Sequence, residues 1–207
     1  MTDRLPATPA GIARAAKLLA TGEIVAFPTD TVYGVGVAGS RPDRLEALFE
    51  LKRRPAERRI PLLVADIGQV PTEAWTVDER AHRLVERFWP GGLTLVLASV
   101  DGSTTQAFRA PNHRTALELI AAAGPLLATS ANVSDEPDTL SADDVLIAFA
   151  TRQSELAAVL DGGPAPGGVA STVIDLSVTP ARILREGPIP RADLAASVEA
   201  DIQAKPL

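Results

Sequence analysis

The stretch FPTDTVYGVGVAG, Phe27–Gly39, joins a polar turn to an apolar run that contains three glycines. The preceding residues, Glu23–Phe27, have the apolar pattern of a buried strand, which Pro28 ends. Gly34–Gly39 matches the G-x-G-x-x-G pattern of dinucleotide-binding loops, but such a loop needs a helix that starts inside the motif. The next helical pattern starts only after Ser40. The stretch therefore predicts two strands joined by a polar turn, not a cradle for pyrophosphate.

Helical and strand patterns alternate along the rest of the chain, which predicts an α/β domain with a twisted sheet. Thr8 and Pro9 have the residue types of an N-cap and a first helical position. Because no repeat or clear linker interrupts the pattern, residues 1–207 are predicted to form a single domain. Helices are predicted over 8–23, 41–52, 77–89, 114–124, 141–150 and 191–202, and strands over 23–28, 32–38, 60–67, 93–99, 107–111, 125–132, 171–177 and 181–187. The stretch 156–163 contains either a strand or the end of a helix.

Composition excludes several classes of protein. The chain has no cysteine, which rules out disulfides and thiolate–metal sites, and its two histidines, His82 and His113, lie far apart. No metal site is therefore predicted. The net charge of −6 gives no support to general nucleic-acid binding. We expect a cytoplasmic protein without a membrane contact, because the first residues do not form a signal peptide and no segment approaches about 20 apolar residues.

A basic cluster follows one predicted helix, in the stretch LKRRPAERR at 51–59. Lys52 and Arg54 are two residues apart and would share a face if Pro55 ends the helix. Arginine and lysine at such a position suit phosphate or carboxylate groups, although a solvated basic patch is the simpler interpretation. We expect both residues to be exposed, and their replacement by alanine to abolish turnover with little loss of fold.

Polar side chains also follow several predicted strands, where ligands bind in open α/β sheets. Ser130 and Asn132 would face the same way in an extended segment. Arg109 and Arg185 each stand among apolar residues at a strand end, where an arginine usually meets a carboxylate of the protein or a ligand. The competing interpretation is a set of ordinary polar turns, including one in which Asp30 caps backbone amides. Together these cations and hydroxyls indicate an anionic substrate that carries phosphates.

The chain resembles the Sua5/YrdC/YciO family, and specifically its L-threonylcarbamoyladenylate synthases. The resemblance covers about 8–187, with 188–207 as a C-terminal helical tail, and includes the K-x-R…S-x-N signature. It rests on ordered blocks rather than on any single motif. These blocks are GEIVAFPTDTVYGVG, FELKRRP, IPLLV, WPGGLTLVL, FRAPNH, TSANVSDEP, LDGG, GGVASTVID and ILREG.

The resemblance implies a fold, a reaction and a set of site residues. The fold would be a single-domain, twisted, open mixed sheet flanked by helices, around a large, positively lined cavity. The enzyme would be a nucleotidyltransferase that converts L-threonine, bicarbonate (or CO2) and ATP, with Mg2+ accompanying ATP, to threonylcarbamoyladenylate and pyrophosphate. The product would pass to a separate system that modifies tRNA. Threonine would be held by Thr31, Arg109 and Ser171, and ATP by the catalytic set Lys52, Arg54, Ser130 and Asn132 together with Arg185.

Some positions depart from the family's usual pattern. Ala65 and Asp66 stand where many members have a histidine, and Asp135 replaces a glycine of the SANxSG block. These changes leave a YciO-type paralogue open. An RNA-binding module, which would permit weak tRNA binding, is a second possibility and is supported only by the basic cluster. A nicotinamide-dependent enzyme is a third and is supported only by the glycine pattern.

Overall fold

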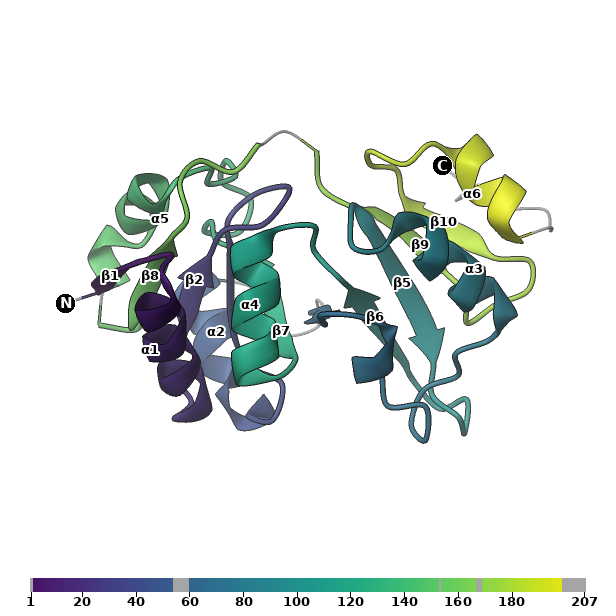
Figure 1. Ribbon diagram of the computed structural model, residues 1–207, viewed down its shortest axis with the longest axis horizontal. Helices are drawn as coiled ribbons and strands as arrows, with labels where there is room; N and C mark the ends of the chain where they lie inside the picture. The colour runs from purple at the N-terminus through teal and green to yellow at the C-terminus, as the bar shows by residue number, and fades with distance from the viewer. Residues whose placement is uncertain (1, 54–59, 153, 167–168, 199–207) are drawn as a thin grey trace.

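The protein is an α/β domain whose described residues form a mixed sheet of ten strands (Figure 1). The computed structural model describes residues 2–53, 60–152, 154–166 and 169–198. The strand order is β1-β8-β2-β3-β7-β4-β6-β5-β9-β10. The strands are β1 (Asp3–Pro6), β2 (Val25–Phe27), β3 (Gly34–Ala38), β4 (Leu62–Leu63), β5 (Leu93–Ala98), β6 (Thr105–Arg109), β7 (Leu126–Ser130), β8 (Ala158–Asp161), β9 (Thr172–Asp175) and β10 (Arg182–Arg185).

Several helices begin at side-chain caps, of which Thr8 was predicted from the sequence. Thr8 caps the first helix by accepting a hydrogen bond from the Gly11 amide, and Ser141 forms a capping box with Asp144. The α-helices are α1 (Pro9–Ala20), α2 (Leu45–Lys52), α3 (Glu79–Phe88), α4 (Arg114–Ala123), α5 (Ala142–Ala148) and α6 (Arg191–Val198). The 3-10 turns are η1 (Pro42–Arg44), η2 (Ile67–Gln69) and η3 (Ala150–Arg152). No helix among these described residues has the length and apolarity needed to cross a membrane.

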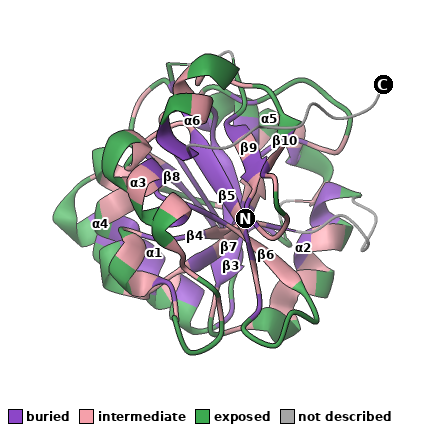
Figure 2. Ribbon diagram, turned by 90° about the vertical axis from the view of Figure 1, so that its right-hand side faces the viewer, coloured by how far each residue is buried: buried purple, intermediate pink, exposed green. Residues whose placement is uncertain are grey.

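The strands β8, β2, β3 and β7 are covered on both faces. Successive side chains of a strand point to opposite faces. Val25 therefore packs into a core with α1 and α4, whereas Ala26 packs into a core with α2 and α5. Figure 2 shows the result, with buried strands running through the middle of the molecule and exposed residues on the outer faces of the helices.

The strands β5, β6, β9 and β10 are covered by helices α3 and α6 on one face. Leu93, Leu95 and Leu97 of β5 belong to this third core, as does Phe108 of β6. The intervening residues of these strands, such as Thr94, point to the other face of the sheet. That face lines the pocket described below.

The glycine-bearing stretch is a strand and not a nucleotide loop, as the sequence predicted. Gly34 and Gly36 lie inside β3, which pairs antiparallel with both β2 and β7. A Cβ atom on Gly36 would lie 2.4 Å from the carbonyl oxygen of Leu127 and 2.7 Å from the Cβ atom of Ala128. Glycine therefore allows β3 and β7 to approach closely.

Gly36→Ala is expected to lower the free energy of unfolding by about 1–3 kcal/mol, because the clash is with backbone that both strands hold in place. Gly68→Ala is the matched control, since its Cβ atom would meet only the Asp66 carboxylate, at 3.0 Å. We expect the control to change stability by about 0.5 kcal/mol or less. Urea unfolding of both variants measures the difference, and equal stabilities would contradict the close approach.

Strand β1 has no counterpart among the strands predicted from the sequence. It pairs parallel with β8, from Asp3 opposite Ala158 to Pro6 opposite Asp161. Its residues are mostly exposed, so they carry no apolar pattern from which a strand could be read. The strand exists because the edge of β8 supplies backbone partners, an interaction between residues far apart in the sequence.

Candidate active site

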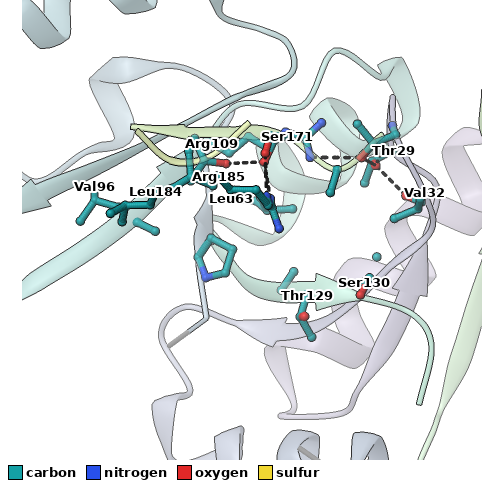
Figure 3. A pocket seen from close by; sticks show the side chains of 18 of the residues that line it. Thr29, Val32, Leu63, Val96, Arg109, Thr129, Ser130, Ser171, Leu184 and Arg185 are labelled. Atoms are coloured by element: carbon teal, nitrogen blue, oxygen red, sulfur yellow. Dashed lines mark hydrogen bonds between the residues drawn. The ribbon is translucent and has the colours of Figure 1, made fainter. Parts of the chain in front are cut away.

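A pocket of about 670 Å³ lies over the face of β5, β6, β9 and β10 that is opposite to α3 and α6 (Figure 3). The turn between β2 and β3 and the end of β7 complete its walls. Five of the residues that the sequence singled out line it. They are Thr31, Arg109, Ser130, Ser171 and Arg185.

Arg109, at the end of β6, is fixed by three different partners. Its Nη2 atom lies 2.6 Å from the Asp30 carboxylate, and its Nε atom donates to the carbonyl oxygen of Gly91 at 3.1 Å. Its Nη1 atom donates to the Thr31 hydroxyl at 3.2 Å. The prediction that this arginine meets a carboxylate is confirmed, and the carboxylate belongs to the protein.

The Asp30 carboxylate has a role different from the one in the competing interpretation, which was to cap backbone amides. It accepts a hydrogen bond from Arg109, and the amide of the turn instead donates to Thr29, whose Oγ1 atom lies 3.2 Å from the Thr31 nitrogen. The turn and β6 are far apart in the sequence, so local pattern could not pair them. The signal in the sequence was an arginine flanked by apolar residues.

Three groups form a directed chain of hydrogen bonds at the Arg109 end of the pocket. Arg109 donates to the Thr31 hydroxyl, and the Thr29 hydroxyl donates to the carbonyl oxygen of Val32 at 2.6 Å. Each hydroxyl has a single proton, so the 3.1 Å contact between Thr29 and Thr31 requires Thr31 to donate to Thr29. The remaining hydrogen-bonding capacity of the Thr31 hydroxyl is therefore that of an acceptor.

A second cation, Arg185, enters the pocket from β10. Its Nε atom donates to the carbonyl oxygen of Ser171 at 2.9 Å, and its Nη2 atom contacts the Ser171 hydroxyl at 3.0 Å. That hydroxyl lies 2.8 Å from the Thr94 hydroxyl. The register of β10 shifts between Ile183 and Arg185, a bulge that lets both Leu184 and Arg185 line the pocket.

The sheet register places both arginines at one level of the pocket. Leu95 pairs with Phe108, which puts Thr94 beside Arg109, and Val173 pairs with both Thr94 and Arg185. Burial lowers the pKa of Arg185, and the positive charge of Arg109 lowers it further. Two guanidinium groups that repel each other across a pocket favour an anion between them.

Lys52 is buried, which corrects the expectation that it is exposed. It is the last residue of α2 and only 1% exposed. Its Nζ atom donates to the carbonyl oxygens of Ser130 and Asn132, the latter at 2.5 Å, and contacts the Asn132 Oδ1 atom at 3.3 Å. Burial of an ammonium group is possible because these acceptors replace water. Arg54, which was expected to share its face, lies outside the described residues.

Ser130 and Asn132 lie together, as their spacing predicted. The Ser130 hydroxyl donates to the Asn132 Oδ1 atom at 2.6 Å, and the side-chain Nδ2 atom of Asn132 donates to the Glu136 carbonyl oxygen at 2.6 Å. Ser130 lines the pocket, whereas Lys52 and Asn132 are not among its lining residues. The signature residues thus form a layered arrangement in which Ser130 stands in front of the buried lysine.

Two departures from the family pattern have a local structural explanation. Asp135 has a φ of 66°, a left-handed conformation that favours the glycine usual at this position and that aspartate tolerates better than most residues. Asp66 caps the turn η2 by accepting a hydrogen bond from the Gly68 amide. Both residues are therefore compatible with the backbone that surrounds them.

The charge of the pocket is mixed among the described residues. Arg109 and Arg185 line it together with Asp138 and Asp175. The positively lined cavity implied by the resemblance therefore stays a prediction, and its remaining charges would have to come from residues outside the described part of the chain. A group of three or more histidine, cysteine, aspartate or glutamate side chains that could hold a metal ion does not occur in the described part of the chain.

The chain is similar in sequence and in fold to known proteins. The Sua5/YciO/YrdC family model, described as telomere recombination, matches residues 17–187. A Bacillus subtilis threonylcarbamoyl-AMP synthase is 37% identical over 96% of this chain and 59% of its own. The solved structure of Pyrococcus abyssi Sua5 complexed with L-threonine has a TM-score of 0.87 and is 34% identical, over 98% of this chain and 62% of its own. The Escherichia coli YciO structure, with a TM-score of 0.81 and 22% identity, covers 94% of this chain and 100% of its own and shares the fold.

The chain therefore spans about three fifths of the Bacillus and Pyrococcus proteins, which are longer. The match nevertheless includes the pocket residues Thr31, Arg109, Ser130, Ser171 and Arg185, because all of them lie within the residues that the family model covers. Fold, motif order and sequence identity lead to the same assignment. This chain belongs to the Sua5/YciO/YrdC family.

Proposed function

We propose that the protein is a threonylcarbamoyl-AMP synthase, a nucleotidyltransferase that joins L-threonine, bicarbonate or CO2, and the AMP part of ATP. The observation that carries the proposal is the pair Arg109 and Arg185, held at one level of a single pocket together with hydroxyl groups. A pocket of about 670 Å³ is within the range of small-molecule sites. The synthase names of the relatives, and the threonine bound to the Pyrococcus protein, support the same reaction class.

The amino-acid substrate would lie at the Arg109 end. Its carboxylate fits the remaining N–H groups of Arg109, since a guanidinium has five N–H donors and three of its contacts are to the protein. The Thr31 hydroxyl, which can accept, would take a hydrogen bond from the amine or hydroxyl of threonine. Ser171, placed between Arg185 and Thr94, would contact the substrate from the Arg185 side.

Two bond-forming steps complete the reaction. The amine of threonine and bicarbonate give a carbamate and water. A carbamate oxygen then attacks the α-phosphorus of ATP, the bond from that phosphorus to the bridging oxygen breaks, and pyrophosphate leaves. Such chemistry needs positioning and charge stabilisation rather than covalent participation of the protein. Arg185, Ser130 and, outside the described residues, Arg54 would stabilise charge on the phosphates.

The structure changes the role that we propose for two signature residues. Lys52 and Asn132 act as positioning residues, because their polar atoms bond to the turn that carries Ser130. Mg2+ would accompany ATP and bind mainly through its phosphates, as this ion commonly does. The pocket's described carboxylates, Asp138 and Asp175, do not form the cluster of a resident metal site.

The test of the proposal is pyrophosphate release by the purified protein. We expect release only when ATP, L-threonine and bicarbonate are all present, together with a product whose mass is that of threonylcarbamoyl-AMP. Omitting each substrate in turn is the control. A folded protein that releases no pyrophosphate from the full mixture would contradict the proposal and favour a YciO-type paralogue. Salt-dependent tRNA binding without turnover would favour an RNA-binding module.

A further inference from the structure

Asp138 lies where the main pocket meets a second cavity. The second cavity has a volume of about 450 Å³ and is lined by the loop after β7, by α5 and by η3. Asp138 is common to the linings of both cavities. Asp138, an exposed residue, therefore lies at the rim of the main pocket, on a loop distant in sequence from the strand that carries Arg185.

Hydrogen bonds on either side fix the backbone around Asp138. The side-chain Nδ2 atom of Asn132 donates to the carbonyl oxygen of Glu136 at 2.6 Å. The Thr139 hydroxyl donates to the carbonyl oxygen of Ala131 at 3.1 Å, and the carbonyl oxygen of Thr139 accepts from the Tyr33 amide at 2.9 Å. The loop that carries Asp138 is thus attached to the same turn that positions Ser130.

The charge of Asp138 acts on Arg185 through space. The Arg185 guanidinium donates its hydrogen bonds to Ser171, and Asp138 lines the same pocket. In agreement with that placement, Asp138 raises the pKa of Arg185 against the larger opposing effects of burial and Arg109. Arg185 is consequently exposed to a negative charge that is not its hydrogen-bonding partner. Any anion that approaches Arg185 experiences the same carboxylate, as repulsion.

We propose that Asp138 is a specificity-determining residue that weakens the binding of polyanions at Arg185. The repulsion grows with the charge that the ligand places near the rim, so free pyrophosphate is disfavoured more than a singly charged group. This would favour departure of the pyrophosphate after the reaction. The inference rests on the proposed function, in which Arg185 contacts the phosphates of ATP.

Isothermal titration with inorganic pyrophosphate tests the inference without any turnover. Asp138→Asn keeps the shape of the side chain and removes its charge, and we expect pyrophosphate to bind about three- to fivefold more tightly at low salt. The gain should shrink as salt is added, because salt screens charges at an exposed rim. Glu136→Gln is the matched control, since Glu136 lines the second cavity but not the main pocket. The control should leave the affinity unchanged.

A double-mutant cycle with Arg185→Gln identifies the partner. We expect Arg185→Gln to weaken pyrophosphate binding, and Asp138→Asn to give no gain in that background. Unchanged or weaker binding in the single variant Asp138→Asn would overturn the inference and leave the proposed function standing. If Arg185→Gln does not weaken pyrophosphate binding, the phosphate role of Arg185 and the inference both fail. Thermal unfolding of each variant shows whether a change in affinity reflects a change in fold.

Discussion

Arg109→Ala is expected to lower the free energy of unfolding by about 3–5 kcal/mol and to abolish threonine-dependent pyrophosphate release. The side chains of Arg109 and Asp30 are only 10% and 16% exposed. Removing the guanidinium leaves the Asp30 carboxylate in a place where water cannot fully replace its partner. The same change removes the group that would hold the substrate carboxylate. Urea unfolding and the pyrophosphate assay measure the two effects separately.

The double variant Asp30→Asn with Arg109→Gln separates stability from activity. It removes both charges of the pair, so we expect it to recover much of the stability that Arg109→Ala loses. It should nevertheless stay inactive, because a carboxamide cannot replace a guanidinium at the substrate carboxylate. Wild-type stability of Arg109→Ala would contradict the buried ion pair, and activity in the double variant would contradict the substrate role of Arg109.

Lys52→Met is expected to lower the free energy of unfolding by about 2–4 kcal/mol. Methionine preserves the apolar stem, but the carbonyl oxygens of Ser130 and Asn132 lose a charged donor in the interior of the protein. The turn that carries the Ser130 hydroxyl would then lose its support, so turnover should fall by more than the loss of folded protein explains. Measuring kcat on the folded fraction, with stability from urea unfolding, tests both consequences.

Lys17→Met is the matched control for this change, since Lys17 lies on the exposed face of the last turn of α1. We expect the control to alter stability by about 0.5 kcal/mol or less and to leave turnover intact. Little loss of stability in Lys52→Met, which is what an exposed lysine would give, would contradict the burial of this side chain.

Sequence alone predicted most elements because their signals are local. Thr8 and Ser141 mark helix starts through contacts within a few residues, and the apolar pattern at 93–99 predicts the strand β5. Strand β1 could not be predicted, because an exposed segment becomes a strand only when β8 lies beside it. The local sequence pattern indicates which secondary structure a segment prefers, whereas the pairing of distant segments depends on the whole fold.

The same distinction explains the outcome at the candidate site. Arg109 and Arg185 were identified from their place at strand ends, and the family resemblance added Thr31 and Ser171. All four residues line the pocket. The burial of Lys52 could not be read from a stretch rich in arginine, because it depends on carbonyl groups that the chain supplies from the distant turn at Ser130. Chemistry at strand ends can be inferred from sequence, whereas the choice of partner requires the fold.

The two arginines of the pocket lie on strands that differ in how many neighbouring strands they pair with. Arg109 is on β6, which is hydrogen-bonded on both sides, to β4 and β5. Arg185 is on β10, which ends the sheet and pairs with β9 alone among the described strands. A strand that is paired on one side opens locally more readily than a strand that is paired on both. We therefore expect the Arg109 end of the pocket to keep its geometry when a ligand binds, and the Arg185 end to adjust more readily.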